Sequence, residues 1–92
     1  MKVKIYTRNG CPYCVWAKQW FEENNIAFDE TIIDDYAQRS KFYDEMNQSG
    51  KVIFPISTVP QIFIDDEHIG GFTELKANAD KILNKNRLIW SK

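Results

Sequence analysis

Residues 2–14 read KVKIYTRNGCPYC and carry the pattern that decides the fold. The first part alternates apolar and polar residues, which is the period of a half-buried strand, and Asn9-Gly10 supplies a turn signal. Pro12 suits the first position of a helix, because its φ is already helical and its missing N–H would have no intrahelical partner there. The stretch therefore predicts a strand over residues 2–7 and a helix that begins directly after Cys11.

The next residues indicate a parallel βαβ unit. Ala17, Trp20 and Phe21 recur at helical spacing, which gives the predicted helix a buried face, and two asparagines end it. Residues 26–33 are rich in aromatic and β-branched types and predict a second strand. A helix between two strands implies parallel strands joined by a right-handed crossover.

The second half of the chain predicts a helix, a hairpin and a final helix. Residues 36–48 place aromatic residues among charged ones, and residues 61–65 and 67–69 flank an acidic turn. Thr73 is a candidate N-cap for the last helix, whose apolar side carries Leu75, Ala79, Ile82 and Leu83. The predicted order is β-α-β-α-β-β-α, an α/β fold with three helices.

Length and composition favour one small soluble domain spanning residues 1–92. Twelve basic and thirteen acidic residues leave a net charge of −1, so no overall field favours nucleic acid or an anionic membrane. No segment reaches the roughly 18 apolar residues of a membrane span, and the first residues do not resemble a signal peptide. We therefore expect a cytoplasmic monomer. In a reducing compartment, its two cysteines indicate redox chemistry or metal binding rather than a permanent structural disulfide.

The spacing of Cys11 and Cys14 predicts a redox-active pair. At the N-cap of a helix, the free N–H groups of Tyr13 and Cys14 can donate to the Cys11 sulfur, and the helix dipole favours the thiolate. Residues three apart at a helix start lie about 5–6 Å from each other, within the range that a disulfide accepts. Cys14 points into the helix and is the more protected thiol, suited to release a mixed disulfide from Cys11.

A zinc site is the alternative interpretation of two cysteines at this spacing. A structural zinc centre needs four ligands, and the sequence offers two cysteines and one histidine. That histidine, His68, lies beside the predicted hairpin turn, and we expect it to be exposed. We therefore predict that the chain binds no metal.

Three motifs together resemble the glutaredoxin family: residues 11–14 (CPYC), residues 58–64 (TVPQIFI) and residues 70–73 (GGFT) before a helix. The resemblance spans nearly the whole chain and implies a thioredoxin-like fold with a four-stranded mixed sheet. It implies that Cys11 attacks, that Cys14 resolves, and that glutathione is the reducing co-substrate. It also implies a cis peptide between Val59 and Pro60.

The resemblance further implies a glutathione-binding groove. The backbone of Val59, between Thr58 and Pro60, would pair with glutathione as an added strand does. Backbone N–H groups at the helix start, near Gly71, Phe72 and Thr73, would receive the γ-glutamyl carboxylate.

Side chains complete the groove that the resemblance implies. Arg8 matches a family lysine and would hold the glycyl carboxylate, with a solvated loop charge as the alternative. Tyr13 would line the groove or lie on the surface. On the helix predicted over residues 36–48, Arg39, Lys41 or neither corresponds to the family's ligand-binding position.

Three features lie outside the family pattern or its motifs. Thr73 stands where the family frequently has aspartate, which would remove one contact to the ligand's amino group. Residues 51–57 are longer and more apolar than the family's link and would either cover a core edge or form a docking surface. Trp16 falls off the buried helix face, so we expect it to be partly exposed, either as a docking patch or packed on a loop.

Three classes of function remain open at this point. The first is a glutathione-dependent oxidoreductase acting on protein disulfides and glutathione mixed disulfides, with ribonucleotide reductase among its potential partners, or a similar reductase served by thioredoxin reductase. The second is a dimer holding a [2Fe–2S] cluster through Cys11 and two glutathiones, which Pro12 and Cys14 disfavour. The third is an adaptor domain, which leaves the paired cysteines unexplained.

Overall fold

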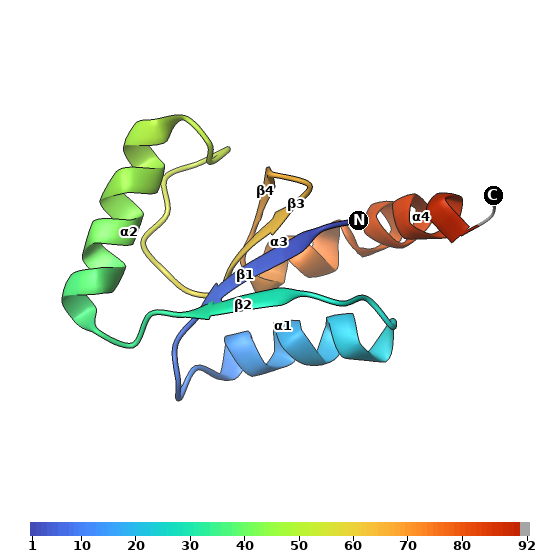
Figure 1. Cartoon of the computed structure of the whole chain (residues 1–92), viewed down its shortest axis with the longest axis horizontal. Helices are drawn as coiled ribbons and strands as arrows, with labels where there is room; N and C mark the ends of the chain where they lie inside the picture. The colour runs from blue at the N-terminus through green and yellow to red at the C-terminus, as the bar shows by residue number, and fades with distance from the viewer. Residues whose placement is uncertain (91–92) are drawn as a thin grey trace.

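The structure, a computed structural model, describes the backbone of residues 1–90 and the side chains of residues 1–86. Its elements follow the predicted order through the hairpin (Figure 1). They are β1 (Val3–Thr7), α1 (Pro12–Glu23), β2 (Asp29–Ile32), α2 (Tyr36–Ser49), β3 (Gln61–Ile64), β4 (Glu67–Gly70), α3 (Phe72–Ala77) and α4 (Ala79–Trp90). Across residues 1–90, no helix combines the length and the apolar character that crossing a membrane requires.

The sheet has four strands in the order β2-β1-β3-β4. β1 pairs with β2 in parallel and with β3 antiparallel, and β3 and β4 form the antiparallel hairpin. All four residues of β3 are buried, and three of them, Ile62, Phe63 and Ile64, form an apolar run of the kind found in central strands. The predicted α/β fold with a four-stranded mixed sheet is confirmed.

The core lies between the sheet and the helices α1 and α3. Val3 and Ile5 point to this side of β1, and Ala17, Phe21 and Leu75 are each 0% exposed against them. The opposite face of β1 presents Tyr6, whose ring lies 4.4 Å from that of Phe42 in α2. Figure 1 shows α1 running along the sheet while α2 stands off to one side. This arrangement leaves the C-terminal end of β1 and the N-terminus of α1 at one edge of the molecule.

Two elements differ from their predicted extent by more than one residue, whereas the predicted bounds of the others agree to within one residue. β2 covers Asp29–Ile32 rather than residues 26–33, and Ile32 is 50% exposed because β2 is an edge strand. The final helix is divided into α3 and α4 at Asn78, which makes four helices within residues 1–90 instead of three. The Asn78 side chain donates to the carbonyl of Glu74 at 2.8 Å, so Asn78 caps the end of α3 and does not continue that helix.

The prediction that Thr73 is the N-cap of the last helix is wrong, because α3 begins at Phe72 with Gly71 as its N-cap.

The prediction that His68 is exposed is also wrong. This side chain is 4% exposed, because the segment 51–57 folds over it. Within that segment Ile56 is buried, whereas Ile53 is 71% exposed. The segment therefore covers a core edge at one position and faces solvent at another.

Candidate active site

Cys11 is the N-cap of α1, as predicted. Its backbone is extended, with φ −105° and ψ 107°, and Pro12 takes the first helical position. The Cys11 sulfur accepts a hydrogen bond of 3.1 Å from the N–H of Cys14. An anion on this sulfur would gain from that N–H and from the positive end of the helix dipole.

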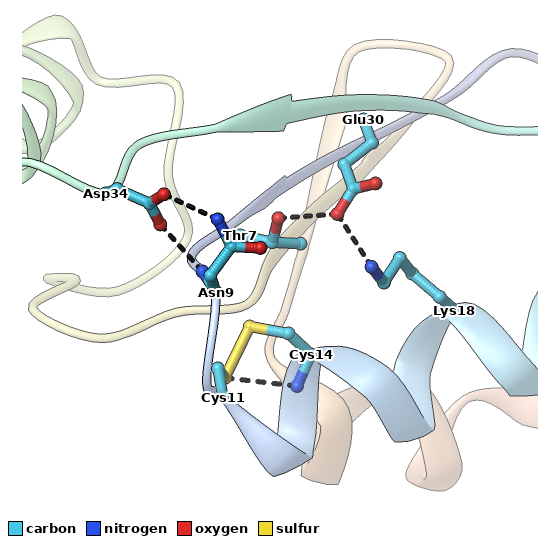
Figure 2. Close-up of polar contacts among 7 residues, drawn as sticks. All are labelled: Thr7, Asn9, Cys11, Cys14, Lys18, Glu30 and Asp34. Carbon is cyan, nitrogen blue, oxygen red and sulfur yellow. Dashed lines mark hydrogen bonds and ion pairs between the residues drawn. A yellow bond between two sulfur atoms is a disulfide. The ribbon is translucent and has the colours of Figure 1, made fainter.

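Cys11 and Cys14 form a disulfide in this structure (Figure 2). Their Cα atoms lie 5.2 Å apart, which agrees with the separation expected from the helical spacing. Cys14 is 1% exposed and Cys11 is 5% exposed, so Cys14, which the sequence predicts to be the resolving thiol, is the more protected of the two. The pair can therefore change between disulfide and dithiol without a movement of the helix backbone that carries the two cysteines.

The loop that contains Val59 and Pro60 lies against the Cys11 sulfur. The Val59-Pro60 peptide bond is cis, which confirms what the family resemblance implies. The Val59 carbonyl oxygen is 3.7 Å from the Cys11 sulfur. The two segments, 48 positions apart in sequence, therefore meet at the Cys11 sulfur.

A clamp holds the turn that precedes Cys11. The Asp34 carboxylate accepts from the backbone N–H of Asn9 at 2.7 Å and from its side-chain amide at 2.6 Å (Figure 2). The backbone hydrogen bond from Asn9 is the main cause that lowers the pKa of Asp34 below its ordinary value. The charged form of the Asp34 carboxylate therefore holds the loop between β1 and α1 in place.

A second polar cluster connects α1 to strands β1 and β2. Glu30 of β2 accepts from the Thr7 hydroxyl at 2.6 Å, and its carboxylate is 2.9 Å from the Lys18 ammonium (Figure 2). Burial alone would raise the pKa of Glu30, but the Thr7 hydroxyl and the Lys18 ammonium together lower it. Lys18 is one helical turn after Cys14, so the cluster secures the helix that carries both cysteines.

Two grooves meet beside Cys11. One, of about 340 Å³, is lined by predicted site residues and one further residue: Tyr13, Thr58, Val59, Pro60, Gly71, Phe72, Thr73 and Glu74. The other, of about 560 Å³, has a more varied lining: Arg8, Cys11, Pro12, Tyr13, Tyr36, Arg39, Tyr43, Ser57, Thr58 and Val59. Every predicted site residue except the buried Cys14 lines one of the two grooves. The two grooves share Tyr13, Thr58 and Val59, while Arg8 lines only the second groove and Thr73 only the first.

Glu74 is a groove residue that the sequence reasoning missed. Its carboxylate oxygen accepts from the N–H of Gly71 at 2.8 Å, which satisfies one free donor at the start of α3. The signal was present in the sequence, because a glutamate three residues after an N-cap is the second half of a capping box.

The structure also separates the two basic candidates on α2. Arg39 lines the second groove, and its guanidinium donates to the carbonyls of Ile33 and Asp34. Lys41 instead lies 3.9 Å from Glu45 on an exposed part of the helix. Of the two, only Arg39 lies among the lining residues of the grooves beside Cys11.

Trp16 is 47% exposed, which confirms the prediction of partial exposure. Its ring lies 5.2 Å from that of Tyr13 and 5.9 Å from that of Phe72. These three rings form an aromatic cluster next to the groove.

Within the described part of the chain, no three histidine, cysteine, aspartate or glutamate side chains gather as a candidate metal-binding group.

Comparisons with known proteins agree with this geometry. The family model for glutaredoxins matches residues 3–69. Glutaredoxin 1 of Escherichia coli K12 is 40% identical over 80 residues, covering 84% of this chain and 91% of that protein. A glutaredoxin of Vibrio cholerae is 42% identical over 86 residues, covering 90% and 95%. The solution structure of a Brucella melitensis glutaredoxin is 35% identical, with a TM-score of 0.65 over 88% of this chain and 80% of that one.

Proposed function

This chain belongs to the glutaredoxin family of thiol–disulfide oxidoreductases, and we propose that it draws its electrons from glutathione to reduce protein disulfides and glutathione mixed disulfides. The observation that carries the proposal is the position of the Cys11 sulfur. It lies at the N-cap of α1, against Val59, where two grooves of peptide-binding size converge.

The chemistry begins at Cys11. Its thiolate attacks the glutathione sulfur of a mixed disulfide, so a new bond forms between Cys11 and glutathione and the substrate leaves as a thiolate that takes a proton from water. A second glutathione thiolate then attacks the bound glutathione sulfur. Oxidised glutathione leaves and the Cys11 thiolate is restored. The balance is one free glutathione consumed, its sulfur now joined to the glutathione that the substrate carried, and one substrate thiol released.

A protein disulfide requires Cys14 as well. After Cys11 attacks, the protein is held by a mixed disulfide, and Cys14 attacks the Cys11 sulfur to release it. The product is the Cys11–Cys14 disulfide, the state in which this structure holds the pair. Two glutathiones then reduce that disulfide.

The grooves supply a binding mode for glutathione. We place its backbone along Thr58 and Val59, where an extended peptide gains main-chain hydrogen bonds. The start of α3 offers N–H groups to the γ-glutamyl carboxylate at Phe72 and Thr73, since the N–H of Gly71 is already taken by Glu74.

The charged side chains suit the other groups of the ligand. We place the glycyl carboxylate near Arg8 and Arg39, the two guanidinium groups that line the second groove. Glu74 carries a negative charge in the first groove and suits the ligand's ammonium group. Thr73 has no charge and cannot form this ion pair.

The partner and compartment follow from this chemistry. Electrons supplied by glutathione suit a protein of the reducing cytoplasm. Ribonucleotide reductase is the protein substrate we would test first, as a monomeric glutaredoxin of this type would serve it through Cys11 and Cys14.

The proposal is tested by glutathione-dependent reduction of a small mixed disulfide, coupled to glutathione reductase. We expect Cys11→Ser to be inactive and Cys14→Ser to keep most of its activity, because only protein disulfides need the second thiol. A wild-type protein that is inactive with glutathione but accepts electrons from thioredoxin reductase would refute the proposal.

A further inference from the structure

His68 of β4 occupies a buried polar site behind the grooves. It is the single histidine of the sequence, and its side chain is 4% exposed. The rings of Phe54 and Phe63 both lie beside it, each with a centroid 5.0 Å away. A buried imidazole in an aromatic slot needs partners for both ring nitrogens, and each of them has one.

The partners of the ring fix its tautomer. The backbone N–H of Ile53 donates to Nδ1 at 3.0 Å, so Nδ1 carries a lone pair and no proton. The proton is therefore on Nε2, which donates to Oε1 of Gln61 at 2.8 Å. With that oxygen facing the ring, the Gln61 amide nitrogen donates to the carbonyl of Thr58 at 3.0 Å.

These bonds form one directed relay from the segment 51–57 to the groove. Each donor points the same way: Ile53 to His68, His68 to Gln61, and Gln61 to Thr58. Thr58 precedes Val59, whose carbonyl lies against the Cys11 sulfur. A change in the ring would therefore reach the loop on which we place glutathione.

Resting on the proposed function, we propose that His68 is a positioning residue: its neutral imidazole, through Gln61, holds the Thr58 carbonyl and so sets the groove for the glutathione moiety of the substrate. It touches neither the substrate nor Cys11. Its effect is to limit the freedom of the Thr58-Val59 backbone, which binding would otherwise have to order.

Protonation would disable the relay. A proton on Nδ1 would face the N–H of Ile53, so two donors would oppose each other. Burial lowers the pKa of His68, and the charge of Glu74 on α3 opposes that shift in part. Four uncharged groups contact the ring: the two phenyl rings, the Gln61 amide and the Ile53 N–H. The neutral form therefore prevails at pH 7.

Kinetics of the reduced enzyme with a glutathionylated peptide test the role. His68→Phe keeps the aromatic volume and removes both hydrogen bonds, and we expect the KM for the glutathionylated substrate to rise about fivefold to tenfold with kcat little changed, the fold-change that one lost hydrogen bond produces. His68→Gln can still donate toward Gln61 and should recover part of the loss. Alkylation of Cys11 by iodoacetamide, a reagent without a peptide backbone to pair with Thr58 and Val59, should keep its rate.

A matched control separates positioning from general stability. Ile82→Ala removes a side chain that is 5% exposed in α4, away from the relay, and should lower stability without raising KM. An equal rise of KM in Ile82→Ala and His68→Phe would overturn the proposal, and so would an unchanged KM in His68→Phe. If His68→Phe fails to fold, Gln61→Met interrupts the same relay and must raise KM.

Ring nitrogen NMR of the wild type tests the relay without any activity. For the wild type we expect a neutral His68 ring protonated on Nε2 at pH 7. In His68→Phe we expect the backbone amide resonances of Thr58 and Val59 to move away from their wild-type chemical shifts. A cationic ring or a proton on Nδ1 would overturn the proposal. A wild type that shows the expected tautomer and shifts but no glutathione-dependent activity would instead refute the proposed function.

Discussion

Replacing Glu30 by glutamine tests how the helix that carries the cysteines is held. The glutamine keeps the shape and one acceptor for the Thr7 hydroxyl, but it removes the charge that faces Lys18 at 2.9 Å. Hydrogen bonds to a charged group contribute about 1.5–3 kcal/mol, while solvent-exposed ion pairs contribute about 0–1 kcal/mol. Side-chain exposures of 24% for Glu30 and 28% for Lys18 place this pair between those cases. We expect Glu30→Gln to lower the free energy of unfolding by about 1–2 kcal/mol.

The assay is urea unfolding at pH 7 and again in acid, with thermal unfolding as a second probe. A loss of this size lowers Tm by roughly 4–16 °C in a domain of this length. The pKa of the Glu30 carboxyl is lowered from 4.5, so its stabilisation is complete above that value and is lost as pH falls through the lower pKa of the folded state. The difference between wild type and variant must therefore shrink in acid.

Glu22→Gln, on the exposed side of α1, is the matched control and should change stability little. Two results would refute the reasoning. One is a Glu30→Gln variant as stable as the control at pH 7. The other is a loss of stability that persists unchanged at a pH where the wild-type carboxyl is protonated.

Three further predictions concern the frame of the site. Leu75→Ala, at a position with 0% exposure, should cost about 2–5 kcal/mol in urea unfolding, and a smaller loss would mean that α3 collapses onto the gap. Gly70→Ala should destabilise by about 1–3 kcal/mol, because its φ is +119° and a Cβ would lie 2.8 Å from Glu74. Asp34→Asn weakens the clamp on Asn9. Because the pKa of Asp34 is lowered mainly by that backbone hydrogen bond, its stabilisation is present above the ordinary pKa and lost as pH falls, so wild type and variant should converge in acid by thermal unfolding.

Local chemistry explains what the sequence could predict. The helix start at Pro12, the N-cap position of Cys11 and the reach of Cys14 depend on residues within four positions of one another, and all three are confirmed. The burial of Ile62, Phe63 and Ile64 in β3 also follows from their own apolar character. The cis peptide before Pro60 is different, because its prediction came from the family resemblance and not from local pattern.

One error arises where distant segments decide, and another where two caps compete at the same helix start. His68 has the sequence setting of an exposed hairpin residue, but Ile53 and Gln61, 15 and seven positions away, supply its partners. Thr73 is a good N-cap by type, yet the helix begins earlier because Glu74 can reach the N–H of Gly71. Neither outcome can be read from hydrophobic periodicity.

The residues on α2 show the same limit. Sequence spacing could not choose between Arg39 and Lys41, because the choice depends on which side of the helix faces the loop at Ile33. Nor could it show that the segment 51–57 is anchored to α2, where Asn47 exchanges two hydrogen bonds with the backbone of Ile56.

The most direct test of the central claim is mass spectrometry of the reduced Cys14→Ser variant after incubation with oxidised glutathione. We predict a single glutathione adduct per chain, located on Cys11 and removed by added glutathione. The reduced Cys11→Ser variant, treated in the same way, should acquire little adduct on the buried Cys14. Absence of an adduct on Cys11, or equally fast modification of Cys14, would contradict the account of Cys11 as the nucleophile that receives glutathione.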